Sequence, residues 1–397
     1  MIVRPGGAFV VLIALATSAS AEPAGGEGQP APTASTAPAP TGTVAKAQPA
    51  SDPATSSEAA PPKRFDWEPF GYLRMQYIAV QDDPLSVFVG RNDGFELQNA
   101  RFGIRGTLLD RAAFVVAIEG AVDARRQVNT PRGRMEVRLK DAFVDTHVSS
   151  QIDVRAGFFE SLVDPNIEGD TVREFVDRPL ESRGMRATEG FETSGLTPGR
   201  SLGAAIRLQP VAPASGAAVG FEVAVQNGAD EYASNNDNNL PAASASALLL
   251  LPAGGWMVAS ARFNRRTVGD VQALKNEDDL QGTIGARIIA GPVAFGAAAA
   301  FVRTTYPTTG GPVQNAYGAH GQLTYTIPAR TPVTLGYRFG ILDPSSLLLT
   351  DRVMEHTVGA AISVPAYSMR LQLQATHVVE QRELSNGRVQ LAAEVAL

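Results

Sequence analysis

The chain has 397 residues, a formal net charge of −6 at pH 7 and no cysteine. The lack of cysteine excludes disulfides and thiolate metal sites, and the acidic balance argues against a nucleic-acid partner. Beyond the N-terminal region, no run of 18 or more consecutive apolar residues occurs, which excludes a bundle of membrane-spanning helices.

The first 21 residues have the pattern of a secretory signal peptide. Arg4 is basic, residues 8–16 form an apolar run, and small residues at 19–21 precede Glu22. The apolar run has about ten residues, well short of the roughly 20 that a spanning helix needs. We expect residues 1–21 to be removed and the mature chain to begin near Glu22.

Residues 22–64 consist mainly of Ala, Pro, Thr, Ser and Gly. Such a composition buries too little apolar surface to offset the entropy lost on ordering the chain. We therefore expect residues 22–64 to be a disordered periplasmic linker and residues 65–397 to form a separate barrel domain.

From Phe65 onward the chain shows about sixteen runs in which apolar and polar residues alternate, which is the pattern of half-buried strands. The runs lie near residues 70–80, 95–109, 112–123, 135–148, 151–160, 200–209, 217–226, 243–251, 255–266, 280–290, 292–304, 316–327, 331–341, 353–364, 367–379 and 388–397.

The connections between these runs alternate in length. The short ones lie at 110–111, 149–150, 210–216, 252–255, 291, 328–330 and 365–366. The long ones lie at 81–94, 124–134, 161–199, 227–242, 267–279, 305–315, 342–352 and 380–387. Short turns at one rim and long loops at the other are typical of outer-membrane barrels. The predicted fold class is all-β, a transmembrane antiparallel β-barrel with long extracellular loops and short periplasmic turns, in the bacterial outer membrane.

Residues 100–109, "ARFGIRGTLL", carry arginines within an apolar strand pattern. Alternation puts Phe102, Ile104 and Leu108 on one face and Arg101 and Arg105 on the other. In a membrane barrel the apolar face contacts lipid, so the arginines face the lumen. The same parity predicts a set of pore-lining, anion-guiding arginines: Arg74, Arg101, Arg105, Arg155, Arg207, Arg262, Arg287, Arg338 and Arg370.

Arginine suits such a lumen because its guanidinium stays charged and presents a planar fork of donors to oxyanions. A barrel of this size leaves an aqueous channel, so we expect a porin for small hydrophilic solutes that favours anions. For any single arginine the alternative is a pairing with a lumenal carboxylate that stiffens the wall. Candidate carboxylates on the same face are Glu119, Asp123, Asp153, Glu222, Glu355 and Glu394.

The connection at 161–199 is long for a segment without a strand or helix pattern, and such segments are usually functional. We expect it to fold inward as a constriction loop, with a surface loop as the alternative. Its candidate constriction residues are Arg173, Arg178, Arg183 and Arg186.

The segments "FELQNARFGIRGTLL", "LKDAFVDTHV", "VRAGFFES" and "FVDRPL" occur in this order between residues 95 and 180. In order and spacing this half of the chain resembles the phosphate-selective porin O and P family. The resemblance implies a homotrimer of sixteen-stranded barrels in outer-membrane lipid, each with an arginine ladder. It also implies pore lysines, but only Lys140 lies in a predicted strand, so we expect a more general anion or small-solute porin.

Two other functions remain open: a non-conducting structural or adhesive barrel, and a barrel enzyme. The four histidines, His147, His320, His356 and His377, come with no nucleophile motif. We therefore predict no catalytic residue, no metal and no cofactor, and we expect His320 to face the lumen, His147 to lie beside a periplasmic turn, and His356 and His377 to face outward.

Overall fold

The computed structural model describes residues 65–83, 93–109, 111–123, 135–166, 174–184, 195–210, 216–228, 235–269, 272–381 and 385–397. The predicted signal peptide and linker, residues 1–64, lie outside the described residues, so their boundaries stay predictions.

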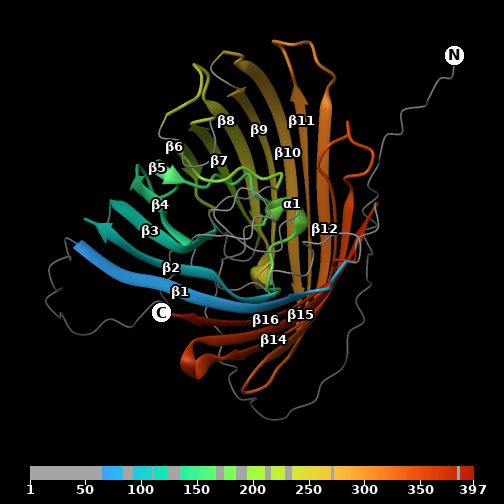
Figure 1. The fold of residues 1–397 in the computed structure, drawn as a ribbon. Coiled ribbons are helices and arrows are strands. Elements are labelled where there is room, and N and C mark those ends of the chain that lie inside the picture. Colours follow the sequence, from blue (N-terminus) through green and yellow to red (C-terminus); the bar gives the residue numbers. More distant parts are fainter. Residues whose placement is uncertain are drawn as a thin grey trace, which may run out of the picture. The chain divides into compact units, whose positions relative to one another are not determined.

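Sixteen antiparallel strands form one closed barrel in which each strand pairs with its sequence neighbours and β1 pairs with β16 (Figure 1). The first eight strands are β1 (Phe65–Val80), β2 (Gly94–Leu108), β3 (Ala112–Asp123), β4 (Met135–His147), β5 (Ile152–Phe159), β6 (Ser201–Leu208), β7 (Ala218–Gln226) and β8 (Ala242–Leu250). The second eight are β9 (Trp256–Val268), β10 (Lys275–Ala290), β11 (Val293–Thr305), β12 (Gln314–Ile327), β13 (Val333–Asp343), β14 (Val353–Val364), β15 (Met369–Glu380) and β16 (Arg388–Ala396).

This architecture confirms the predicted transmembrane barrel and the order of its strands. Two strand starts differ clearly: β1 begins at Phe65, before the predicted run at 70–80, and β10 begins at Lys275, within a segment predicted to be loop. The extension of β10 is held by charged cross-strand pairs. Arg266 lies 3.1 Å from Glu277 and 2.8 Å from Asp279, and Arg265 lies 2.6 Å from Asp278. Charged pairs continue the ladder beyond the apolar belt, so the alternation of apolar residues did not reveal it.

The outer face of the barrel is apolar. Large hydrophobic side chains such as Leu73, Ile206, Ile284 and Leu391 point outward and are 51–60% exposed. Aromatic residues cluster near both strand ends, which is the girdle pattern of a barrel embedded in a bilayer. The girdles include Phe65, Trp67, Phe295, Tyr325 and Tyr367 at the short-turn end and Tyr77, Phe95, Phe263, Phe301 and Tyr317 at the other.

Among the described residues, the helical segments are single turns: α1 (Leu180–Arg183), η1 (Pro252–Gly254) and η2 (Pro365–Tyr367). None of the described helices is long and apolar enough to cross a membrane. The 3-10 turns η1 and η2 lie in short connections, whereas α1 belongs to the long segment between β5 and β6 and lies inside the barrel (Figure 1).

Candidate functional site

The segment between β5 and β6 folds into the lumen, and we call its described parts, residues 161–166, 174–184 and 195–199, the inner loop. Its first part runs along the wall of β7 to β10. The Leu162 amide donates to Glu222 Oε1 at 2.7 Å, and the Leu162 carbonyl oxygen accepts from Ser260 Oγ at 2.5 Å. The next carbonyl oxygen, of Val163, accepts from Thr283 Oγ1 at 2.7 Å.

The second part of the inner loop lies against the wall from β12 to β16. The Val176 amide donates to Gln374 on β15 at 2.8 Å, and Gln98 on β2 donates to the Val176 carbonyl oxygen at 3.1 Å. Gly336 leaves room for the Phe175 ring, because a Cβ atom there would lie 2.8 Å from Phe175 Cζ. Wall and loop are therefore shaped to each other.

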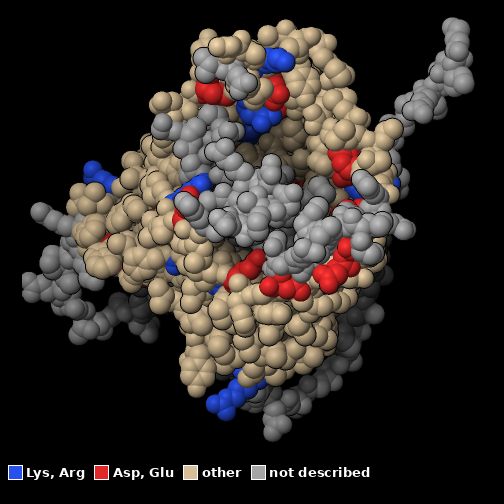
Figure 2. Space-filling model, in the orientation of Figure 1, with Lys and Arg blue, Asp and Glu red and all other residues tan. Residues whose placement is uncertain are grey.

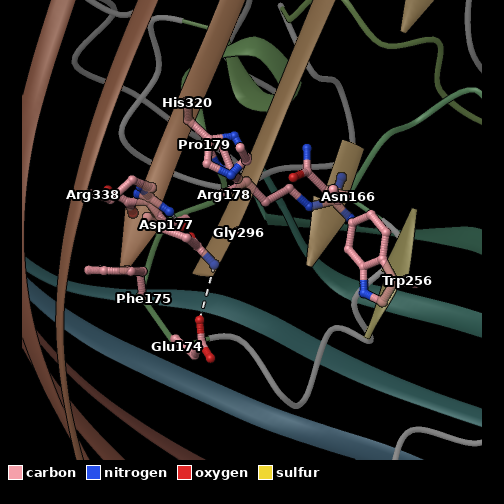
Figure 3. A pocket seen from close by; sticks show the side chains of 13 residues that line it. Asn166, Glu174, Phe175, Asp177, Arg178, Pro179, Trp256, Gly296, His320 and Arg338 are labelled. Carbon is pink, nitrogen blue, oxygen red and sulfur yellow. Dashed lines mark hydrogen bonds between the residues drawn. The ribbon is translucent and has the colours of Figure 1, made fainter. Parts of the chain in front are cut away.

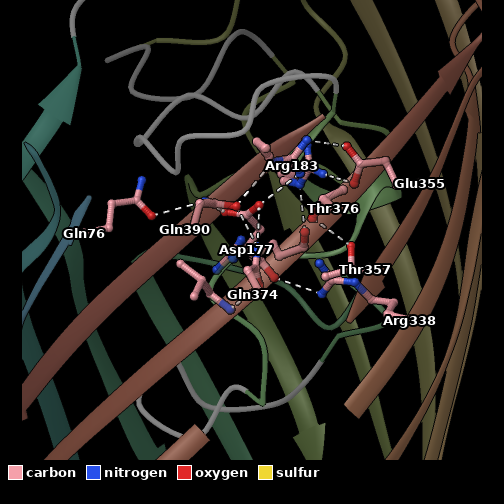
Figure 4. A network of polar contacts seen from close by, with 12 residues as sticks. Gln76, Asp177, Arg183, Arg338, Glu355, Thr357, Gln374, Thr376 and Gln390 are labelled. Atoms are coloured by element: carbon pink, nitrogen blue, oxygen red, sulfur yellow. Dashed lines mark hydrogen bonds and ion pairs between the residues drawn. The ribbon is translucent and has the colours of Figure 1, made fainter. Parts of the chain in front are cut away.

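Asp177 is the centre of a buried polar network that fixes the inner loop to β15 and β16 (Figure 4). Its carboxylate accepts from Gln390 Nε2 at 2.7 Å, Arg388 Nη2 at 3.0 Å and Gln374 Nε2 at 3.1 Å. Its backbone carbonyl oxygen accepts from Arg338 Nη1 at 2.9 Å. All four of these partners lie on strands of the barrel wall.

A second anchor joins α1 to the wall. Arg183 donates to Glu355 on β14, and Glu355 also accepts from Arg388 at 2.9 Å, so both anchors share Arg388. The Glu181 carboxylate lies 2.6 Å from His320 Nδ1 on β12, and both side chains are almost fully buried. Burial opposes ionisation of Glu181, but its contact with His320 keeps the pKa of this carboxyl below its usual value.

Asp164 joins the two ends of the inner loop. Its Oδ1 accepts from the Asn166 amide at 2.8 Å and from Ser182 Oγ at 3.3 Å, and Thr197 Oγ1 lies 3.4 Å from Oδ2. Burial, followed by the nearby carboxylate of Glu160, raises the pKa of Asp164 to about 6. We therefore expect Asp164 to change its protonation state in the mildly acidic range.

The predicted lumenal arginines lie on the inner face, and most of them contact a carboxylate. Their described acidic partners are Glu394 for Arg74, Glu119 for Arg101, Glu68 for Arg105, Asp145 for Arg155, Glu222 for Arg207 and Glu174 for Arg287. Arg338 donates to the Asp177 carbonyl oxygen, Arg262 lies opposite Gln281, and Arg370 lies opposite Glu394. The pairing alternative that the sequence left open fits this geometry for most members of the set.

The pairs differ in how much water they contact. The side chains of Arg74 and Arg388 are 1% and 5% exposed, whereas that of Arg105 is 41% exposed. Arg155 and Arg207 lie between these values at 13% and 17%. The side chain of Arg287 on β10 is also 17% exposed, whereas that of Arg101 on β2 is only 8% exposed.

Of the predicted constriction residues, Arg183 is buried in the α1 anchor and Arg178 lines a cavity. Arg173 and Arg186 lie outside the described residues. The cavity lies between the inner loop and the wall, with Phe175, Trp256, Gln322 and Arg338 among its lining residues (Figure 3). Arg183 thus holds the loop in place, while Arg178 borders open space.

Sequence reasoning assigned no anchoring role to three acidic residues of the inner loop, Glu174, Asp177 and Glu181. It also missed the aromatic rings that support two arginines: the Arg155 guanidinium carbon lies 3.6 Å from the Phe143 ring centre, and that of Arg101 lies 5.1 Å from the Tyr72 ring centre. The inward glutamines Gln374 and Gln390 were a usable signal, because amides on a lumenal face can bond a backbone that enters the lumen.

The histidines lie as predicted: His320 faces the lumen, His147 is near a short turn and bonds Asp153, and His356 and His377 are exposed on the outer face. Within the residues that the structure describes, no group of three or more His, Asp or Glu side chains is arranged to hold a metal ion. Figure 2 shows acidic and basic side chains around the opening that faces the viewer, with acidic ones gathered along its lower edge.

No protein-family model matches the chain, and no curated protein matches it. Solved structures do. The outer membrane channel DcaP of Acinetobacter baumannii is similar with a TM-score of 0.56 and 15% identity over 86% of this chain and 99% of that one. The anion-selective porin from Comamonas acidovorans is similar with a TM-score of 0.57 and 14% identity over 84% and 100%.

The trimer form of OmpT, an outer membrane protein of Vibrio cholerae, is also similar, with a TM-score of 0.55 and 9% identity over 84% of this chain and 100% of that one. Identities this low show the fold alone. The chain has the barrel architecture of outer-membrane porins and channels, and a sixteen-stranded barrel with an apolar belt fits the bacterial outer membrane.

Proposed function

We propose that the protein is a passive diffusion channel for small hydrophilic solutes. The observation that carries this proposal is a closed sixteen-stranded barrel whose inner face is polar and whose inner loop is bonded to the wall strands. Barrels of this size enclose more space than wall side chains fill, so water and small solutes have a route through the remainder.

The channel is proposed to favour anions mildly. A guanidinium has five N–H donors, and a carboxylate partner occupies one or two of them. The pairs Arg105–Glu68, Arg155–Asp145 and Arg207–Glu222 therefore keep donors for a passing oxyanion, although each carboxylate cancels much of the long-range field. Phosphate specificity is not proposed, because the family resemblance implies a cluster of pore lysines and the described strands contain only Lys140 and Lys275.

A trimer is proposed for the assembled form, supported by the resemblance in sequence and by the trimeric form of one structural neighbour. Enzyme activity is not proposed, because the lumenal histidine His320 is buried against Glu181 with no described nucleophile beside it. A non-conducting barrel is the competing function, and the anchored inner loop is the observation that favours it.

Planar-bilayer recording of the purified protein separates these functions. We expect stepwise conductance in symmetric KCl. In a KCl gradient we expect a reversal potential whose sign indicates a mild preference for anions. Inserted, heat-modifiable protein without conductance would support the structural barrel instead. A cation-selective current would support the channel function and contradict the preference for anions.

A further inference from the structure

The outer face of β9 to β11, at the rim of the long connections, carries an exposed arginine within the aromatic girdle. Arg303 follows Phe301 by two residues on β11, so both side chains point outward. Phe301 is 44% exposed, and Arg303 is also exposed. Within the described part of the chain, the Arg303 guanidinium has no hydrogen bond or ion pair.

A second outward arginine on the same surface shows the contrast. Arg265 on β9 donates to both oxygens of Asp278 on β10, at 2.6 and 2.8 Å. Its charge is neutralised by the protein itself. Arg303 has no such carboxylate, and an outward charge near lipid is unfavourable unless an anion or water meets it.

The outer surface beside Arg303 has open space at Gly282 between exposed apolar side chains, and we call this space the apolar depression. Gly282 on β10 points outward, and a Cβ atom there would meet nothing within 4 Å. Leu280 and Ile284, the outward residues on either side of it, are both 54% exposed, and Phe301 lies opposite it in register. Arg303 in turn lies opposite Leu280, so the guanidinium is at the edge of the depression that faces the long connections.

We propose that this surface binds a phosphorylated lipid of the outer leaflet, with the phosphate on Arg303 and an acyl chain over Gly282. The pairing of one free cation with an adjacent apolar depression fits an anionic amphiphile. Long connections lie on the extracellular side of such barrels, so the leaflet at this rim is the outer one. Arginine also presents a fork of donors that matches phosphate geometry.

The test measures binding of lipid A to the purified, detergent-solubilised protein by native mass spectrometry. One surface arginine contributes about 1 kcal/mol to the binding of an anionic head group, so R303Q is expected to weaken lipid A binding about fivefold. G282L, which fills the depression, is expected to weaken it as well. R330Q is the charge-matched control, because Arg330 is exposed in the short turn at the opposite rim, and it should bind as the unaltered protein does.

Heat-modifiable mobility identifies folded samples, and R303K, which keeps the charge, should retain more binding than R303Q. Equal binding by R303Q and R330Q would overturn the proposal, as would equal binding of lipid A and its dephosphorylated form. Competition by inorganic phosphate alone at millimolar concentration would show a free-anion site, which also overturns it. Loss of the oligomer in R303Q, with lipid binding kept, would assign the surface to subunit contact instead.

Discussion

Two walls of this barrel carry the same side-chain chemistry in different surroundings. On β14 to β16 and β1, Arg74 and Arg388 are buried among carboxylates and, in the case of Arg388, tied to the inner loop. On β2, β5 and β6, Arg105, Arg155 and Arg207 also pair with carboxylates, but more of each side chain contacts water. The comparison teaches that burial, and not the presence of a carboxylate partner, separates an arginine inside the anchoring network from one that water reaches.

The largest expected effect is on the buried wall. R388M removes the cation shared by Asp177 and Glu355 and leaves both carboxylates buried. Breaking such a pair costs about 3–5 kcal/mol, so we expect a lower temperature of heat modification and a larger single-channel conductance as the inner loop leaves the wall. R105Q is the control with an exposed pair. Unchanged stability of R388M would show that the network does not anchor the loop.

A pH effect on the anchored side is expected next. The pKa of Asp164 is raised to about 6 from 3.8, so the folded state binds this proton more tightly than the unfolded state does. Stability is therefore expected to fall as the pH rises from about 4 to about 6. D164N cannot ionise and should show a flatter profile when the temperature of heat modification is measured at pH 4, 5, 6 and 7. A parallel profile for both proteins would assign the pH dependence to other groups.

A smaller effect is expected where the inner loop packs against the wall. In G336A the added Cβ atom would crowd the Phe175 ring, which lies 2.8 Å from that position. Overpacking of this kind typically costs about 1–3 kcal/mol. G321A is the matched control, because a Cβ atom at Gly321 would meet nothing within 4 Å. Equal temperatures of heat modification for G336A and G321A would mean that the Phe175 ring does not pack tightly against the wall at Gly336.

The smallest expected effect on stability, and the most direct test of selectivity, is on the exposed wall. R105Q should change stability by less than about 1 kcal/mol, because exposed ion pairs contribute little. It should nevertheless lower the anion-to-cation permeability ratio, measured from reversal potentials in a KCl gradient. R74Q should destabilise the barrel more and change the ratio less. A larger loss of stability in R105Q and a larger change of the permeability ratio in R74Q would contradict the distinction between buried and exposed arginines.

The sequence by itself determined the strands, their faces and the alternation of short and long connections. Period-two alternation reports directly which side chains meet lipid, because every second residue on a strand points the same way. This is why Arg101 and Arg105 were placed opposite Phe102 and Ile104 correctly. The starts of β1 at Phe65 and of β10 at Lys275 were not predicted, and in β10 the added pairs are charged on both faces and carry no apolar signal.

The tertiary structure alone decided what the lumenal arginines meet. Arg74 pairs with Glu394, which is 320 residues away along the chain and becomes its neighbour only when β1 closes on β16. The sequence predicted that the inner loop folds inward but not where it attaches, since Asp177 bonds Arg388 and Gln390 through contacts that span more than 200 residues. Local periodicity specifies the face of a side chain, whereas its partner depends on barrel closure and register, which are properties of the whole chain.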